Sequence, residues 1–110
     1  MLPEFEQRLV ERLLDRFYDR RVLAHVEHQT RLGHAIRGDA VTLFELRPDF
    51  DDPAKWVRFP IAQFRFTARS GYWSLYWHDR NGRWQPYEGL DATRNFEALL
   101  TEVDRDPTSI

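Results

Sequence analysis

Residues 31–48 read RLGHAIRGDAVTLFELRP, and this stretch decides the fold because it predicts a β-hairpin. From residue 26 onward, side chains that suit a core alternate with polar or small ones, which is the period of a half-buried strand. Gly38 and Asp39 then form a two-residue turn, with glycine at the position that needs positive φ in a type II′ turn. We therefore expect strands at about 26–37 and 40–47.

The turn also fixes how the two strands of this hairpin face each other. A two-residue loop pairs Ile36 with Val41, and the same register pairs Gly33 with Phe44. Successive side chains of a strand point to opposite faces, so Val41 and Phe44 lie on opposite faces of the sheet. We expect the Val41 face to pack under helices.

A second run of strands follows the loop after residue 47. Alternating patterns predict strands at about 58–67, 72–78 and 83–87, joined by short turns that contain glycine. Pro60 lacks a backbone N–H, and it therefore indicates an edge position or a β-bulge near the start of the first of these strands. Together with the first hairpin, these segments make a five-stranded antiparallel sheet.

The turn at Asn81 and Gly82 decides where Trp84 lies, and two geometries are open. A type I′ turn places Trp84 opposite Asp79, on the face that becomes buried. A type I turn with a glycine bulge places Trp84 opposite His78, on the other face. The sequence alone does not choose between them.

Segments with helical periodicity precede and follow the predicted strands in the sequence. Apolar residues recur at three- and four-residue intervals over about 3–20 and over about 95–106. They are Phe5, Leu9, Leu13 and Phe17 in the first segment, and Phe96, Leu99, Leu100 and Val103 in the second. The 110 residues suffice for one core, so we expect a single α+β domain over 1–110: an N-terminal amphipathic helix, the antiparallel sheet and a C-terminal helix.

The composition excludes several classes of protein. The formal net charge is −2 and the pI is about 6.1, so the chain as a whole has no field that would hold DNA or an acidic membrane. There is no cysteine, which excludes disulfides, thiolate zinc sites and cysteine nucleophiles. No apolar run is long enough for a signal peptide or a membrane span, so we expect a cytoplasmic protein without a membrane partner.

Several motifs of the chain together resemble one family. In chain order they are RLGHAIRGDAVTLFELRP, PIAQFRF, WSLYWHDRNGRWQPY and LLTEVDRDPTSI. From about residue 21 to the end, the sequence resembles the family described as domain of unknown function 3024. The resemblance implies a bacterial, intracellular protein. It implies no catalytic or binding residues, because the family has none assigned.

The sequence contains no P-loop, no Rossmann glycine pattern and no HExxH or GxSxG motif. His28 and His34 share a strand face with Glu45, yet a histidine on an apolar face is typically a hydrogen-bonded core residue. We therefore predict no cofactor, no metal and no catalytic residue, while enzyme activity as such stays open.

One weaker alternative is a metal-dependent hydrolase or nuclease. The residues that suggest it are three acids, Asp49, Asp51 and Asp52, followed by Gln63 and Arg65. Such sites pair an acid with a lysine two residues apart on a strand, and this sequence has no lysine there. The pattern therefore counts against this alternative.

The sheet face opposite the helices is the main candidate for function. By alternation it carries aromatic and arginine side chains, a set too apolar for a fully hydrated surface. With the neighbouring turn, the candidate binding residues are Phe44, Arg65, Tyr76, His78, Arg80, Arg83 and Trp84. Either the monomer covers this face, through sheet curvature or a helix, or a partner does.

Two kinds of partner suit such a face. The first is a protein, most simply a second copy in a homodimer, and the chain is then a non-catalytic protein-interaction or adaptor-like module. The second is a single-stranded nucleic acid, with Tyr76 and Trp84 stacking on bases and Arg65, Arg80 and Arg83 contacting phosphates. The negative net charge favours the first.

Overall fold

The computed structural model describes residues 1–24 and 31–105 of the chain. Its elements are α1 (Glu4–Ala24), β1 (Arg31–Arg37), β2 (Ala40–Pro48), β3 (Trp56–Thr67), β4 (Tyr72–His78), β5 (Trp84–Pro86) and α2 (Phe96–Arg105). The five strands form one antiparallel sheet whose spatial order is the chain order. This confirms the predicted α+β class.

The boundaries differ from the expected ones at several ends. The helix α1 continues to Ala24 instead of ending near residue 20, and β3 begins at Trp56 instead of residue 58. β5 is shorter than the expected strand 83–87. The expected strand residues 26–30, with His28 among them, lie outside the described residues, as does residue 106.

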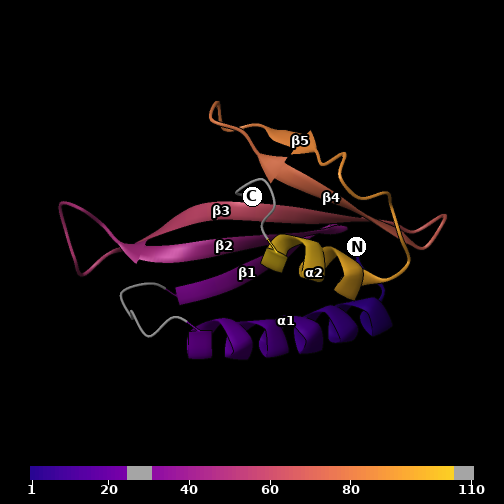
Figure 1. Ribbon diagram of the computed structural model, residues 1–110, viewed down its shortest axis with the longest axis horizontal. Coiled ribbons are helices and arrows are strands. Elements are labelled where there is room, and N and C mark those ends of the chain that lie inside the picture. The colour runs from indigo at the N-terminus through magenta and orange to yellow at the C-terminus, as the bar shows by residue number, and fades with distance from the viewer. Residues whose placement is uncertain (25–30, 106–110) are drawn as a thin grey trace.

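Both helices lie on one face of the sheet, which we call the covered face (Figure 1). In this view α2 crosses in front of the strands and α1 runs along the β1 side. The apolar side chains of the helices and of alternate strand residues meet between the layers. The fully buried members with the largest side chains are Trp73, Phe17, Phe64, Phe96, Leu14, Leu43, Leu99 and Leu100.

An aromatic group forms the centre of this core. The Trp73 ring lies 4.9 Å from the Phe66 ring and 4.9 Å from the Phe96 ring, measured between centroids. Two backbone hydrogen bonds of 2.6 and 2.9 Å join Trp73 to Thr93 and fix the start of α2 against β4. The Asn95 side chain then accepts a hydrogen bond from the Glu97 N–H as an N-cap.

The first hairpin has the register that the sequence predicts, with Ile36 facing Val41 and Gly33 facing Phe44. Gly38 has φ of 60°, as its turn position requires. The predicted irregularity at Pro60 is a β-bulge. Leu43 pairs with Ala62 and Phe44 pairs with Pro60, so β3 has one extra residue at this point.

One residue departs from the simple alternation, and another keeps it but is not fully covered. Ile61, the extra residue of the bulge, packs against the core, although strict alternation with Ala62 would turn it to the opposite face. Trp77 lies on the same face of β4 as Trp73, but 38% of it is exposed. The alternation is correct for Trp77, and the helices cover only the part of that face nearer Trp73.

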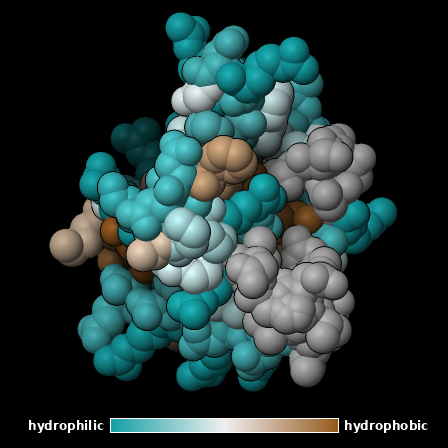
Figure 2. Space-filling model, turned by 90° about the vertical axis from the view of Figure 1, so that its left-hand side faces the viewer, coloured by the Kyte–Doolittle hydropathy of each residue, from teal (hydrophilic) through white to brown (hydrophobic). Residues whose placement is uncertain are grey.

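The loop between β2 and β3 projects from the left-hand end of the molecule in Figure 1. Figure 2 looks onto this end and shows a mostly hydrophilic surface in which pale and brown side chains are interspersed. Among the exposed large apolar residues are Phe50 at 98% and Phe59 at 44%.

Candidate binding face of the sheet

The open face is the side of the sheet that faces away from the helices, and it carries a distinctive set of residues. Across the strands its rows, each in order of pairing, are Arg31, Leu46 and Arg58; Gly33, Phe44 and Pro60; Ala35, Thr42, Gln63 and Tyr76; Arg37, Ala40, Arg65 and Ser74. Four arginines occur in these rows, and no aspartate or glutamate does. The open face is therefore positive in a chain whose formal net charge is −2.

Three of these arginines lie over aromatic rings of other strands: two contacts join adjacent strands, and Arg31 of β1 reaches across β2 to Trp56 of β3. Measured from the guanidinium carbon to the ring centroid, Arg65 is 3.8 Å from Tyr76, Arg58 is 4.4 Å from Phe44 and Arg31 is 4.6 Å from Trp56. A guanidinium on a ring face is stabilised there by a cation–π contact, while its N–H edges can still bind a carboxylate or phosphate.

These guanidiniums have no acidic partner within the described part of the chain. The ion pairs of residues 1–24 and 31–105 join other groups, and none includes Arg31, Arg37, Arg58 or Arg65. Arg65 donates a hydrogen bond from Nε to the neutral Gln63 side chain at 2.6 Å. Within these ranges, the positive charge of the open face is therefore not neutralised by an ion pair.

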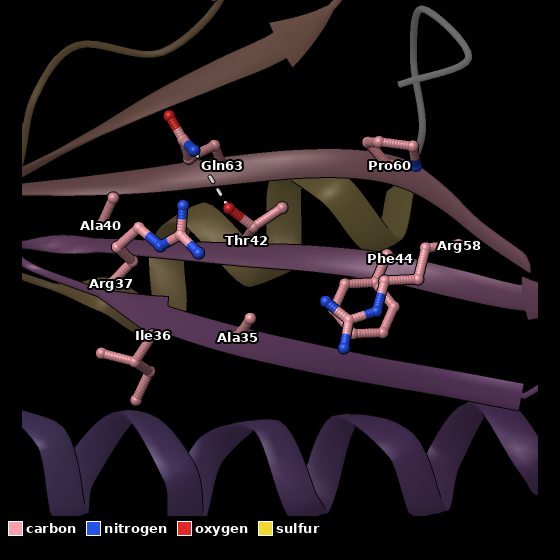
Figure 3. Close-up of a pocket in the computed structure, with 9 residues that line it drawn as sticks. All are labelled: Ala35, Ile36, Arg37, Ala40, Thr42, Phe44, Arg58, Pro60 and Gln63. Atoms are coloured by element: carbon pink, nitrogen blue, oxygen red, sulfur yellow. Dashed lines mark hydrogen bonds between the residues drawn. The ribbon is translucent and has the colours of Figure 1, made fainter.

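A shallow hollow of about 410 Å³ on the open face is lined by two of these arginines, Arg37 and Arg58 (Figure 3). Small side chains, those of Ala35, Ala40 and Thr42, line part of it, and Arg37 and Arg58 extend over it. A 3.0 Å hydrogen bond from the Gln63 amide to the Thr42 hydroxyl crosses one side. The hollow thus combines a small-residue floor with basic groups around it.

Phe44 has a different role from the one its position suggested. It is only 5% exposed, because the Arg58 guanidinium covers its ring and the ring lies against Gly33. A Cβ atom on Gly33 would be 2.8 Å from Phe44 Cε1. This part of the open face is covered within the monomer, so Phe44 offers no free surface for stacking.

The second hairpin adopts the glycine-bulge geometry. The Asp79 N–H donates to the Arg83 carbonyl at 2.8 Å, and Gly82 has φ of 80°. Trp84 therefore faces His78, with ring centroids 4.8 Å apart. Trp84 lies on the open face, half-buried.

The Asp79 carboxylate holds this turn together. Its Oδ1 accepts hydrogen bonds from the N–H groups of Asn81 and Arg83, and its Oδ2 accepts one from the Gln85 amide. These bonds lower the pKa of Asp79, the Arg83 N–H contributing most. The carboxylate therefore stays ionised and bonded inside the turn.

The structure joins some of the predicted site residues and separates others. Arg65 lies on Tyr76, and His78 lies against Trp84. Arg80 and Arg83 are exposed in the turn after β4 and contact no aromatic ring of a described residue. The Phe44 ring lies under the Arg58 guanidinium, a contact that was not predicted.

The sequence analysis missed Arg58 and Trp56 because of the bulge in β3, and it did not follow the outward side of β1 to Arg31 and Arg37. Outward residues of β3 have odd numbers after the bulge, such as Arg65, and even numbers before it, such as Arg58. Pro60 was the available signal for this switch. Placing the bulge there, and following the outward side of β1 from Gly33, would have found all four.

The histidine and acid sets considered for chemistry can be followed only where their members are described. The described residues contain no group of three or more His, Cys, Asp or Glu side chains able to hold a metal ion. The Tyr18 hydroxyl and His34 Nδ1 are hydrogen-bonded at 2.6 Å, and burial, with a smaller effect of Asp15, raises the pKa of Tyr18, so the hydroxyl keeps its proton. His28 lies outside the described residues.

The comparisons with known proteins identify the family but no activity. The family model described as domain of unknown function (DUF3024) matches residues 2–110, so the chain belongs to that family. Neither the curated proteins nor the solved structures provide a match. No helix in the described part of the chain has the length and apolar character needed to cross a membrane.

Proposed function

We propose that this chain is a non-catalytic protein-interaction module whose open face binds an acidic segment of a partner. The observation that carries the proposal is the charge of that face: four arginines, no carboxylate and no neutralising ion pair in the described residues. Interface cores are rich in arginine and aromatic residues and poor in lysine, aspartate and glutamate. The open face has this composition.

The charge argues against the simplest form of the interface, two open faces stacked directly on each other. Such a homodimer would bring one set of arginines against an identical set, and juxtaposed like charges destabilise an interface by several kcal/mol. A partner that supplies carboxylates has the opposite effect. The partner's contact segment should therefore be acidic.

The covered rings favour a protein over a single-stranded nucleic acid. Base stacking needs an accessible ring face, and Arg58, Arg65 and Arg31 already occupy one face of the three rings they contact. The guanidinium edges are the groups left for recognition, and they suit carboxylates. Nucleic acid remains the rival because the same edges bind phosphate.

The test is selection of short random peptides displayed on phage against the purified protein. We expect enrichment of acidic peptides. One of them, made with a fluorescent label, should bind at least about tenfold more weakly to an Arg58→Ala/Arg65→Ala variant, because charge-assisted contacts are lost. Fluorescence anisotropy at low and high salt measures the affinity.

The matched control is Arg12→Ala/Arg16→Ala, which removes the same charge from exposed positions of α1. It should leave the affinity within about twofold. Peptides without acidic residues, or binding that is indifferent to Arg58 and Arg65, would overturn the proposal. Tight binding of labelled oligothymidylate with quenched tryptophan fluorescence, and no peptide selected, would replace it with the nucleic-acid function.

The same proposal keeps the expectations that 1–110 is one domain, that the protein is cytoplasmic and that it needs no cofactor. An interaction module of this kind requires only a rigid scaffold and a surface. The 110 residues without cysteine are compatible with a reducing compartment.

A further inference from the structure

The β2–β3 loop has the chemistry that the open face lacks. Residues 49–52 read DFDD, and Phe50 at their centre is 98% exposed. The loop contains three aspartates and one lysine, Lys55, so it is acidic overall. It projects from one end of the sheet (Figure 1), and Figure 2 views the molecule from that end.

The loop is held in a defined shape by its own hydrogen bonds. The Asp49 N–H donates to the Lys55 carbonyl at 2.8 Å, and the Lys55 N–H donates to the Asp52 carbonyl at 2.9 Å. The Asp49 and Asp52 carboxylates accept hydrogen bonds from backbone N–H groups two residues further along. A segment that is already ordered loses less conformational entropy when it binds.

The tip of this loop, residues 49–52, and the hollow of the open face are complementary in charge and in shape. The tip offers one exposed phenyl ring between carboxylates, and the hollow offers a small-residue floor beneath Arg37 and Arg58 (Figure 3). An aromatic anchor with charged residues around it is a common arrangement at interface hot spots. Within one chain the two cannot meet, because the loop joins two of the strands that line the hollow and projects beyond their ends.

We propose that the tip of one copy docks into the hollow of a second copy. Phe50 enters the hollow, and Asp51 and Asp52 pair with Arg37 and Arg58 of the other copy. This inference rests on the proposed function, since it makes the chain's own DFDD segment one acidic ligand of the open face.

The positions of tip and hollow allow the contact to be reciprocal. Phe44, which lines the hollow, is five residue steps along the chain from Asp49, which corresponds to about 17 Å of extended strand. A two-fold axis between them places each tip on the hollow of the other copy and closes the dimer. The two arginine sets are then offset along the strands, and each faces carboxylates.

The test is a charge exchange followed by sedimentation equilibrium at low salt. The wild type should dimerise. Asp51→Arg/Asp52→Arg has a basic tip and a basic hollow, and Arg37→Asp/Arg58→Asp has an acidic tip and an acidic hollow. Each variant alone should be monomeric, with dimerisation weakened at least about tenfold, and an equimolar mixture should form a heterodimer with both contacts restored.

Two further variants separate the effect of the Phe50 ring from a general effect of charge reversal on dimerisation. Phe50→Ser should weaken the wild-type dimer without a change of charge. Glu88→Arg/Asp91→Arg reverses two exposed acids away from the tip and should leave dimerisation unchanged. Circular dichroism confirms that each variant is folded.

The outcomes distinguish this inference from the proposed function. Asp51→Arg/Asp52→Arg keeps the open face, so it should still bind the acidic peptides selected on the wild type. A wild type that stays monomeric up to millimolar concentration, or a mixture that stays monomeric, would overturn the docking inference even if peptide binding persists. Loss of peptide dependence on Arg58 would overturn the proposed function instead.

Discussion

The two faces of the sheet are built from the same strands but are stabilised in different ways. On the covered face, Trp73, Phe64 and Leu43 are completely removed from solvent by the helices. On the open face, rings are covered by arginine side chains, and neither α1 nor α2 lies over them. Apolar burial supplies most of the free energy of folding, so stability should depend on the first face, while the second is available for recognition.

The largest effect should come from a comparison of two tryptophans on the same strand and the same face. Trp73→Ala removes a fully buried ring that contacts Phe66 and Phe96, and we expect a loss of about 3–5 kcal/mol in the free energy of unfolding. That is a large part of the roughly 5–15 kcal/mol typical of a small domain. Urea denaturation followed by circular dichroism measures it.

Trp77→Ala is the matched control. Trp77 lies four residues further along β4 and is 38% exposed, so its truncation should cost only about 1 kcal/mol. Equal losses for the two variants would show that the helix layer does not determine where stability resides.

One site on the open face, Gly33 against Phe44, is packed as closely as the core, and a substitution there should also reduce stability. Gly33→Ala places a methyl group 2.8 Å from Phe44 Cε1, and the ring cannot easily move because Arg58 covers it. We expect a loss of about 1–3 kcal/mol from overpacking. An increase in stability, as for a strand glycine with free space above it, would contradict the close contact.

The double variant Gly33→Ala/Phe44→Leu identifies the cause. The smaller, flexible leucine leaves room for the methyl group, so part of the loss due to Gly33→Ala should be recovered in the Phe44→Leu background. Additive losses would place the strain elsewhere.

Periodicity was sufficient for the covered face and insufficient for the open one. The pairing of Ile36 with Val41, and the burial of Phe64 and Trp73, follow from alternation and a two-residue turn, which depend on local sequence. The extra residue at the Pro60 bulge changes which positions point outward. Pro60 signals an irregularity in the strand, but the outward direction of Arg58 depends on how β3 pairs with β2 on either side of the bulge.

The same limit applies to how far the helices extend over the sheet. Trp73 and Trp77 have the same parity and the same residue type, so no sequence pattern distinguishes them. What distinguishes them is the tertiary position of α2, whose start is fixed by the hydrogen bonds between Trp73 and Thr93. For Trp84, the sequence reduced the problem to two turns, and the Asp79 side chain stabilises one of them.

A smaller effect is expected at the β1 edge of the covered face. Tyr18→Phe removes the hydrogen bond to His34, which should cost about 0.5–1.5 kcal/mol near neutral pH. Because the pKa of Tyr18 is raised in the folded state, its contribution is complete below about pH 10, the ordinary tyrosine value, and is lost as the pH rises above it.

Denaturant titrations at several alkaline pH values measure this contribution. The free energy of unfolding of the wild type should fall more steeply above pH 10 than that of Tyr18→Phe. Tyr87, whose pKa is also raised, chiefly by its hydrogen bond to Glu102, is present in both proteins and cancels in the difference. Parallel curves would mean that Tyr18 titrates normally in the folded protein.

The smallest loss of stability should accompany the largest loss of binding. Arg58→Ala removes an exposed guanidinium over Phe44, and such a contact contributes only about 0.5–1 kcal/mol. Arg58→Lys keeps the charge but not the planar group, so it should bind acidic peptide less tightly than wild type and more tightly than Arg58→Ala. Urea denaturation and peptide anisotropy on the same samples measure both quantities. A loss of stability as large as that of Trp73→Ala would make Arg58 part of the core, and the open face would then be structural.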